Sequence, residues 1–183
     1  MKAGIRKFAT VLALVSGTLL AAELNVGPAT KSTVVAIFKQ EGVAVDCPFT
    51  RFTGRISYDA KNVGAATALI EVDTASLDIG DPAYSAEVAK KSWFDSAAHP
   101  KATFKSTAIK PLAANRFEAT GTLTMKGKVQ TIVVPVTVTT TAAGNTFDGT
   151  FTISRKAFGI GDPIWESALD DKVAVKFHLV GGR

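Results

Sequence analysis

Alternation between apolar and polar residues recurs seven or eight times between Thr33 and Val180, and this period of two constrains the fold more than any other feature. In the stretch Arg116–Met125, Phe117 and every second residue after it are apolar or glycine, and the residues between them are Thr or Glu. Successive side chains of a β-strand point to opposite faces, so each stretch has one dry face and one wet face. A chain with many such strands must stack two sheets or curl one into a barrel. A barrel of about eight strands leaves room inside for one small ligand.

The N-terminus has the pattern of a secretory signal peptide. Three basic residues within the first seven are followed by the apolar segment Phe8–Leu20 and then by the small residues Ala21 and Ala22. We expect residues 1–22 to be a signal peptide cleaved after Ala22, with cleavage after Ala21 as second choice and an uncleaved anchor as the alternative. The remaining residues, 23–183, are enough for one domain with a core of its own.

The formal charge of +5 does not mark a basic protein, because three of the 21 basic residues lie in the predicted signal peptide and 16 acidic residues oppose the rest. No basic stripe suggests nucleic acid as a partner. The single cysteine, Cys47, cannot form an internal disulfide, and packing is favoured over reactivity for it. The two histidines, His99 and His178, lie far apart in the sequence, so neither a Cys–His pair nor a metal site is expected.

Eight strands are expected, with one short helix between the third and the fourth. The helix is predicted over Ala83–Lys91, because Asp81 can cap it and Pro82 suits its first position. Pro135 cannot donate a hydrogen bond to a neighbouring strand, so its strand should have an edge or a bulge there. The expected strands are Thr33–Gln40, with Val43–Cys47 as an extended continuation, then Arg55–Asp59, Ala66–Asp73, Lys101–Ile109, Arg116–Met125, Lys128–Thr141, Thr146–Ser154 and Lys172–Val180.

The most specific pattern of the chain is carried by seven short segments: Ala36–Gln40, Phe49–Gly54, Asp73–Leu77, Trp93–Phe104, Gly121–Gly127, Ser154–Ile160 and Asp171–Val173. In this order and spacing they resemble the YceI family of exported bacterial lipocalin-like proteins. The resemblance runs over essentially the whole chain after the signal peptide. Two places depart from the family pattern: Cys47-Pro48 stands where many members have a glycine, and Gln40 or Glu41 stands where others have a histidine.

The resemblance implies an all-β fold, an eight-stranded antiparallel lipocalin-like barrel with a short helical insertion after the third strand. It also implies a function without catalysis, in which a periplasmic protein carries an isoprenoid lipid in an apolar barrel cavity. The lipid would be either a polyprenyl chain or an isoprenoid quinone. No cofactor and no metal are expected beyond such a bound lipid. The sequence leaves open whether the protein forms a homodimer.

An isoprenoid tail is uncharged, so its site needs aliphatic and aromatic walls with few polar groups. Small residues on the inward faces, such as Ala68, Ala119 and Gly149, would leave room for it, although the phenylalanines around them could equally fill the barrel. Entry is expected at a mouth beside the helical insertion, where exposed rings would touch a membrane surface briefly. The predicted lining residues are Phe38, Ile56, Ile70, Phe104, Phe117, Leu123, Val134, Phe151 and Phe177, and the predicted mouth residues are Trp93, Phe94, Phe158 and Trp165.

Two other functions remain as alternatives. An enzyme acting on an isoprenoid or quinone in the same cavity would need a titratable group inside, and the inward faces offer only Tyr58 and Ser106. An outer-membrane barrel would need girdles of aromatic residues, whereas this chain has two Tyr and two Trp. Arg155 lies near a rim, where it is expected to pair with Asp170 or Asp171, with contact to a ligand headgroup as the alternative.

Overall fold

The structure, a computed structural model, describes residues 22–181. Of the predicted signal peptide, residues 1–21 lie outside the described residues. Ten strands, one α-helix, α1 (Pro82–Val88), and several short 3-10 turns make up the described chain. The strands are β1 (Ala22–Val26), β2 (Thr33–Gln40), β3 (Val43–Pro48), β4 (Phe52–Tyr58), β5 (Thr67–Asp73), β6 (Lys101–Ala113), β7 (Arg116–Met125), β8 (Lys128–Thr141), β9 (Gly144–Ser154) and β10 (Lys172–Val180).

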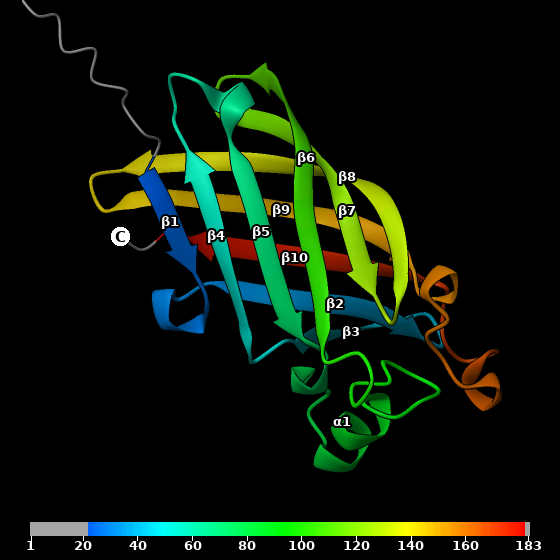
Figure 1. Cartoon of the computed structure of the whole chain (residues 1–183). Coiled ribbons are helices and arrows are strands. Elements are labelled where there is room, and N and C mark those ends of the chain that lie inside the picture. Colours follow the sequence, from blue (N-terminus) through cyan, green and yellow to red (C-terminus); the bar gives the residue numbers. More distant parts are fainter. Residues whose placement is uncertain (1–21, 182–183) are drawn as a thin grey trace, which may run out of the picture.

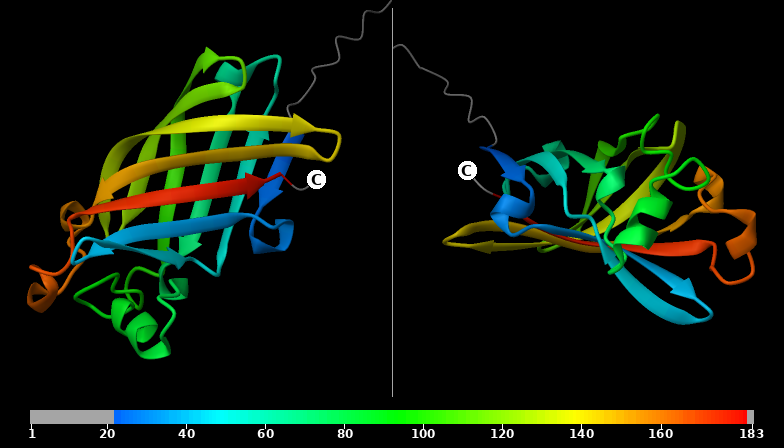
Figure 2. Two further views of the ribbon diagram at one scale, coloured as in Figure 1. Left: turned by 180° about the vertical axis from the view of Figure 1, so that it is seen from behind. Right: turned by 90° about the horizontal axis from the view of Figure 1, so that it is seen from below.

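All ten strands belong to one sheet in the order β1-β4-β5-β6-β7-β8-β9-β10-β2-β3, and every neighbouring pair is antiparallel. The sheet curls over into two layers (Figure 1). The front layer contains β1, β4, β5, β6 and β7, and it crosses the back layer of β8, β9, β10, β2 and β3. Figure 2 shows the same two layers from behind and from below. Within the described residues, β1 and β3 each pair with a single neighbour, so the sheet is an open half-barrel.

The prediction of an eight-stranded barrel is therefore corrected to a ten-stranded half-barrel. All eight expected strands are present, and the two additional strands lie at the edges of the sheet. The short strand β1 buries Leu24 and Val26 in the core. Its five residues do alternate between apolar and polar, but Ala22 falls in the predicted signal peptide, and the four residues that remain are too short a stretch to be predicted as a strand. The extended continuation of the first expected strand is β3, and Pro48 at its end is tolerated because an edge strand has one side without hydrogen bonds.

The strand that contains Pro135 has the edge expected of it. Pairing between β8 and β9 is confined to Thr137–Thr141 and Gly144–Asp148. From Lys128 to Val136, β8 pairs with β7 alone, and the opposing part of β9 pairs with β10 alone. Pro135 thus lies where the two strands separate, so the absence of its N–H costs no hydrogen bond between strands.

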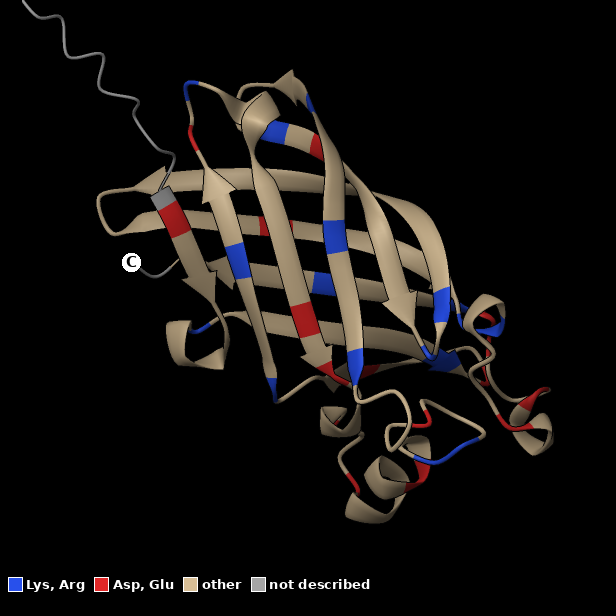
Figure 3. Cartoon of the chain, viewed as in Figure 1, with Lys and Arg blue, Asp and Glu red and all other residues tan. Residues whose placement is uncertain are grey.

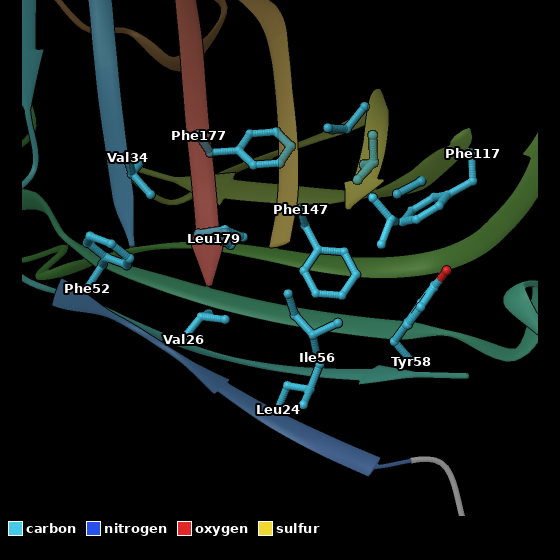
Figure 4. Packing of buried hydrophobic residues seen from close by; sticks show 14 residues of the cluster. Leu24, Val26, Val34, Phe52, Ile56, Tyr58, Phe117, Phe147, Phe177 and Leu179 are labelled. Carbon is cyan, nitrogen blue, oxygen red and sulfur yellow. The ribbon is translucent and has the colours of Figure 1, made fainter. Parts of the chain in front are cut away.

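The core lies between the two layers of the sheet. Phe117, Tyr58 and Phe147 come from three different strands and point toward one another, and Tyr58 and Phe147 meet edge to face with their ring centroids 5.3 Å apart (Figure 4). Two inward glycines let aromatic rings lie against the backbone. A Cβ on Gly121 would stand 2.6 Å from the Phe104 ring, and a Cβ on Gly149 would stand 2.4 Å from the Phe177 ring.

The helical insertion between β5 and β6 is confirmed, although α1 ends at Val88, three residues before the predicted end. The Asp81 side chain caps it as predicted, since Oδ1 accepts hydrogen bonds from the backbone N–H groups of Ala83 at 2.7 Å and Tyr84 at 3.3 Å. None of the helices among residues 22–181 is both long and apolar enough to cross a membrane. Figures 1 and 2 place α1 at the end of the sheet where β5 ends and β6 begins.

Cys47 is expected to be chemically inert in the folded protein. Its side chain is fully buried on β3, and burial, reinforced by the negative charges of Asp78 and Asp46, raises the pKa of its thiol to about 11. The thiolate is the reactive form of cysteine, and the raised pKa leaves little of it at neutral pH. Burial of the side chain also keeps reagents away from the sulfur. We expect no modification by a disulfide reagent such as dithionitrobenzoate in buffer and one modified thiol per chain in guanidinium. Rapid modification of the native protein would contradict this expectation.

Candidate functional site

An elongated cavity of about 680 Å³ lies between the front and back layers of the sheet. Its walls are almost wholly aliphatic and aromatic, and side chains such as Ile56 from the front layer and Phe177 from the back layer face each other across the interior (Figure 4). Twelve of the thirteen side chains predicted for the lining or the mouth lie on its surface. These are Phe38, Ile56, Ile70, Trp93, Phe94, Phe104, Phe117, Leu123, Val134, Phe151, Trp165 and Phe177.

The exception is Phe158, which the sequence placed at the mouth. It ends the 3-10 turn η4 (Lys156–Phe158), is only 1% exposed and does not line the cavity. The left-handed backbone of Gly159 ends the turn, and the Phe158 ring packs in a buried cluster that includes Met125 and Ile160. Phe158 is therefore a core residue, and its assignment to the mouth is wrong.

The rim of the cavity agrees with the predicted mouth only at Trp165, which lines the cavity and is half-buried in the 3-10 turn beside Ile164. Trp93 and Phe94 line the cavity but are each 8% exposed, so they are part of its wall rather than of its rim. Two large apolar side chains both line the cavity and stand in solvent: Tyr84 on α1 is 56% exposed, and Ile164 in the 3-10 turn η5 (Pro163–Trp165) is 78% exposed. The opening accordingly lies between α1 and the turns that connect β9 to β10.

Sequence reasoning missed both rim residues because neither belongs to an alternating stretch. A signal was nevertheless present at Ile164, which is an isoleucine between the acidic residues Asp162 and Glu166 in a segment that has turn-forming residues. An apolar side chain in such a loop has no strand to bury it. Ile164 is therefore exposed at the edge of the cavity.

Arg155 has a structural role, but with partners other than those predicted. Its buried guanidinium donates hydrogen bonds to three backbone carbonyls, from Nε to Asp170 at 3.0 Å, from Nη1 to Ile160 at 3.1 Å and from Nη2 to Leu169 at 2.9 Å. Nη2 also lies 3.5 Å from Glu166 Oε2. The expected pairing with the carboxylate of Asp170 or Asp171 is absent from the ion pairs among residues 22–181. Arg155 instead fixes the path of the turns between β9 and β10.

Asp171 supports the same turns from the other side. Its Oδ1 accepts hydrogen bonds from Ser154 Oγ at 2.7 Å and from the Lys156 backbone N–H at 3.0 Å. Partial burial opposes ionisation, but these hydrogen bonds and the nearby lysines outweigh it and lower the pKa of the Asp171 carboxyl. The segment between β9 and β10 borders the opening of the cavity. Its backbone is held by the side chain of Arg155 at one end and by that of Asp171 at the other.

Titratable chemistry inside the cavity is sparse. Burial, with the nearby charge of Asp59, raises the pKa of the Tyr58 phenol, so the hydroxyl stays protonated at neutral pH. Ser106 Oγ accepts a hydrogen bond from the Ala68 backbone N–H at 2.8 Å, within the sheet. His178 is paired with Asp148 at 2.6 Å on β10 and β9. Among residues 22–181, no three His, Cys, Asp or Glu side chains are arranged to hold a metal ion.

The curled antiparallel sheet around an apolar cavity defines an all-β half-barrel. A YceI-like domain matches residues 26–181, and the chain belongs to this family. Curated relatives include a UPF0312 protein from Vibrio cholerae, which is 33% identical over 86 residues, covering 47% of this chain and 46% of that protein. A UPF0312 protein from Pseudomonas syringae pv. tomato is 32% identical over 123 residues, covering 63% of each chain. The chain thus spans about half of the length of the first of these relatives and less than two thirds of the second.

Two solved structures share the fold. The crystal structure of BcnA from Burkholderia cenocepacia superimposes with a TM-score of 0.81 and 42% identity, over 83% of this chain and 97% of that chain. A polyisoprenoid binding domain from Saccharophagus degradans, implicated in plant cell wall breakdown, superimposes with a TM-score of 0.70 over 89% of this chain and 99% of that domain. Because that domain is only 16% identical, its likeness establishes the fold alone.

Proposed function

We propose that the protein is an exported periplasmic carrier that holds an isoprenoid lipid, either a polyprenyl chain or an isoprenoid quinone, in the cavity between the two layers of its sheet. The observation that carries this proposal is the cavity itself, with a volume of about 680 Å³ and a wall of aliphatic and aromatic side chains. Membership of the YceI-like family supports it, as does the description of one structural relative as a polyisoprenoid binding domain.

The physical argument rests on the match between wall and ligand. A hydrocarbon tail gains about 25 cal/mol for each Å² of apolar surface removed from water. Ligand cavities of about 300–1,000 Å³ that are lined mainly by apolar side chains are typical of small-molecule binding. A branched, uncharged chain needs no polar partners along its length, and most of the residues that line this cavity are aliphatic or aromatic.

An enzyme acting on the same lipid is less well supported by the side chains in reach. Tyr58 keeps its proton, and Ser106 is engaged within the sheet and does not line the cavity, so neither is prepared to act as a base or a nucleophile. The charged residues of the lining are Asp170, Glu87, which is paired with Lys90, and Arg155, which is held by three backbone carbonyls. We therefore propose binding without catalysis. A quinone or prenyl substrate that is recovered chemically unchanged after incubation with the protein would support this part of the proposal.

The test is native mass spectrometry of the protein purified from the periplasm, followed by organic extraction and identification of what is released. We expect one isoprenoid lipid per chain. A protein that carries no lipid, and still carries none after incubation with vesicles that contain isoprenoid quinone, would refute the proposal. Fractionation of the same cells tests the predicted export, because an unprocessed chain in the cytoplasm would contradict it.

We further propose that Ile164 and Tyr84 contact the membrane surface while the lipid passes through the opening. Replacing Ile164 with serine removes an apolar side chain that is 78% exposed, so folding should be little affected. We expect the substitution to weaken membrane affinity by about 1.4 kcal/mol. Uptake of quinone from phosphatidylcholine vesicles should therefore slow about tenfold. The matched control is Val129→Ser on β8, because Val129 is also exposed but does not line the cavity. Equal rates for both variants would rule out this contact.

A further inference from the structure

A tyrosine hydroxyl on the cavity wall has no hydrogen-bond partner. Tyr58 lines the cavity and is 8% exposed, and its hydroxyl takes part in none of the hydrogen bonds among residues 22–181. The oxygen is also accessible, because the one wholly buried side-chain N or O atom without a partner in the described part of the chain is Trp93 Nε1. Buried polar groups ordinarily have a partner, so this hydroxyl is free to bond to a ligand.

Tyr58 lies at the end of the cavity away from α1. It is the last residue of β4, whose first residue, Phe52, pairs with Val72 near the end of β5 that leads to α1. Because a strand rises about 3.3 Å per residue, Tyr58 lies about 20 Å from Phe52 along β4. Figure 4 shows the Tyr58 ring rising from β4 into the interior, with its oxygen on the side of Phe117.

The cavity is wide beside Tyr58 because small residues line it there. Ala68 on β5 pairs with Ile56, which precedes Tyr58 by two residues on β4. Both Ala68 and its neighbour Ala66 line the cavity. Two phenylalanine rings, one from β7 and one from β9, point toward the ring of Tyr58 from other sides (Figure 4). A flat ring packs well against other aromatic rings, so this end suits a ring better than a bare hydrocarbon chain.

The charged groups of the lining lie at the other end, on α1 and on the turns between β9 and β10 (Figure 3). Glu87 is paired with Lys90, and three backbone carbonyls hold the guanidinium of Arg155. The carboxylate of Asp170 only accepts hydrogen bonds, as do the oxygens of a quinone. Gln40 has an amide N–H to donate, but it is exposed, so water competes for it. A quinone ring therefore gains less at this end.

From these observations we propose that an isoprenoid quinone binds with its ring at the Tyr58 end of the cavity, where the Tyr58 hydroxyl donates a hydrogen bond to a quinone carbonyl, and with its tail running toward α1. The inference rests on the proposed function and specifies the headgroup and the direction of the ligand. Burial, with the charge of Asp59, raises the pKa of the Tyr58 phenol, so the proton to be donated is present at neutral pH. The tail then meets the opening, where Tyr84 and Ile164 are exposed.

The experiment uses menaquinone-4 and geranylgeraniol, which carry the same tail, with the refolded, lipid-free full protein. A hydrogen bond lowers the stretching frequency of a carbonyl, so the infrared carbonyl band of bound menaquinone-4 should lie below its position in an apolar solvent. Tyr58→Phe removes the hydroxyl and keeps the ring that packs against Phe147. It should return the band to the solvent position and weaken menaquinone-4 binding about three- to tenfold.

The matched control is Thr122→Val, which removes a hydroxyl from the outer face of β7. Thr122 does not line the cavity, so the variant should keep both the wild-type carbonyl band and the wild-type affinity. Because the Tyr58 hydroxyl has no partner in the protein, Tyr58→Phe should also unfold at a urea concentration no lower than wild type does.

A second pair of variants locates the ring by its width. Ala68→Leu narrows the cavity beside Tyr58 and should weaken menaquinone-4 about tenfold more than geranylgeraniol, because a tail is narrower than a ring. Ala102→Leu narrows the cavity where β6 begins, next to the helical insertion, and should weaken both probes alike. Urea unfolding shows that these variants fold.

A carbonyl band that stays shifted in Tyr58→Phe overturns the inference. So does a selective loss of menaquinone-4 in Ala102→Leu rather than in Ala68→Leu, because the ring would then lie at the α1 end. Both results leave the proposed function standing, since the quinone is still bound. Binding of geranylgeraniol alone overturns the inference in favour of a polyprenyl chain. If neither probe binds, the proposed function itself fails, and this inference fails with it.

Discussion

The substitution Ala119→Phe is expected to weaken binding of geranylgeraniol by about 100-fold or more, equivalent to about 2.7 kcal/mol. Ala119 lies inward on β7, where it pairs with Val134 and lines the cavity. A phenyl ring there would extend into the cavity and take space that the proposed lipid tail needs. Because Ala119 is only 4% exposed and belongs to the packed core, the ring must also displace neighbours, so we expect a cost of about 1–3 kcal/mol in unfolding free energy.

The control is Thr120→Phe, one residue further along the same strand. Thr120 points to the outer face, opposite to Ala119, so the same ring added there should leave the affinity at the wild-type value. Titration calorimetry measures the affinities, and urea unfolding shows that both variants fold. If Ala119→Phe bound the probe as tightly as wild type, the ligand would have to lie outside this cavity.

The substitution Arg155→Ala should lower the free energy of unfolding by about 3–5 kcal/mol. Hydrogen bonds to a charged group contribute about 1.5–3 kcal/mol each, and Arg155 makes three of them with backbone carbonyls that have few alternative partners. Such energies do not add fully, so the expected loss is smaller than their sum. Gly161 packs directly against the guanidinium, and removing the side chain would leave that space empty.

Two further variants separate shape from charge. Arg155→Lys keeps the positive charge but loses the fork that reaches three carbonyls, so most of the destabilisation should remain. Lys156→Ala, which alters the exposed neighbour, should change the unfolding free energy by less than about 0.5 kcal/mol. Urea titrations followed by circular dichroism provide these values. Full stability of the lysine variant would show that the charge alone holds the turns.

The strands could be predicted because the alternation of apolar and polar residues lies within each strand. Alternation within Arg116–Met125 or Lys172–Val180 depends on neighbours along the chain, and both strands have the predicted bounds in the structure. The number of strands and the open edges depend on contacts between distant segments. The strand β1 alternates over only five residues and begins within the predicted signal peptide, so its pairing with β4 could not be predicted from the sequence.

The cavity wall was predictable for the same reason, and the opening was not. Inward residues such as Phe104 and Val134 follow from strand register, whereas Ile164 and Phe158 sit in turns whose path is set by Arg155, far from any periodic pattern. The reasoning from small residues was also incomplete. Gly121 and Gly149 make room for the rings of Phe104 and Phe177 rather than for a ligand.

The separation of β8 from β9 leads us to expect a cavity whose size can change. Between Lys128 and Val136 no ladder hydrogen bond joins these two strands, so the layers can move apart there without breaking any backbone pairing. Side-chain contacts alone resist that motion, and they can be replaced by contacts with a longer tail. If the cavity holds an isoprenoid as proposed, we expect a single sequence to accommodate chains of several lengths in this way, with the size of its interior set by the bound chain.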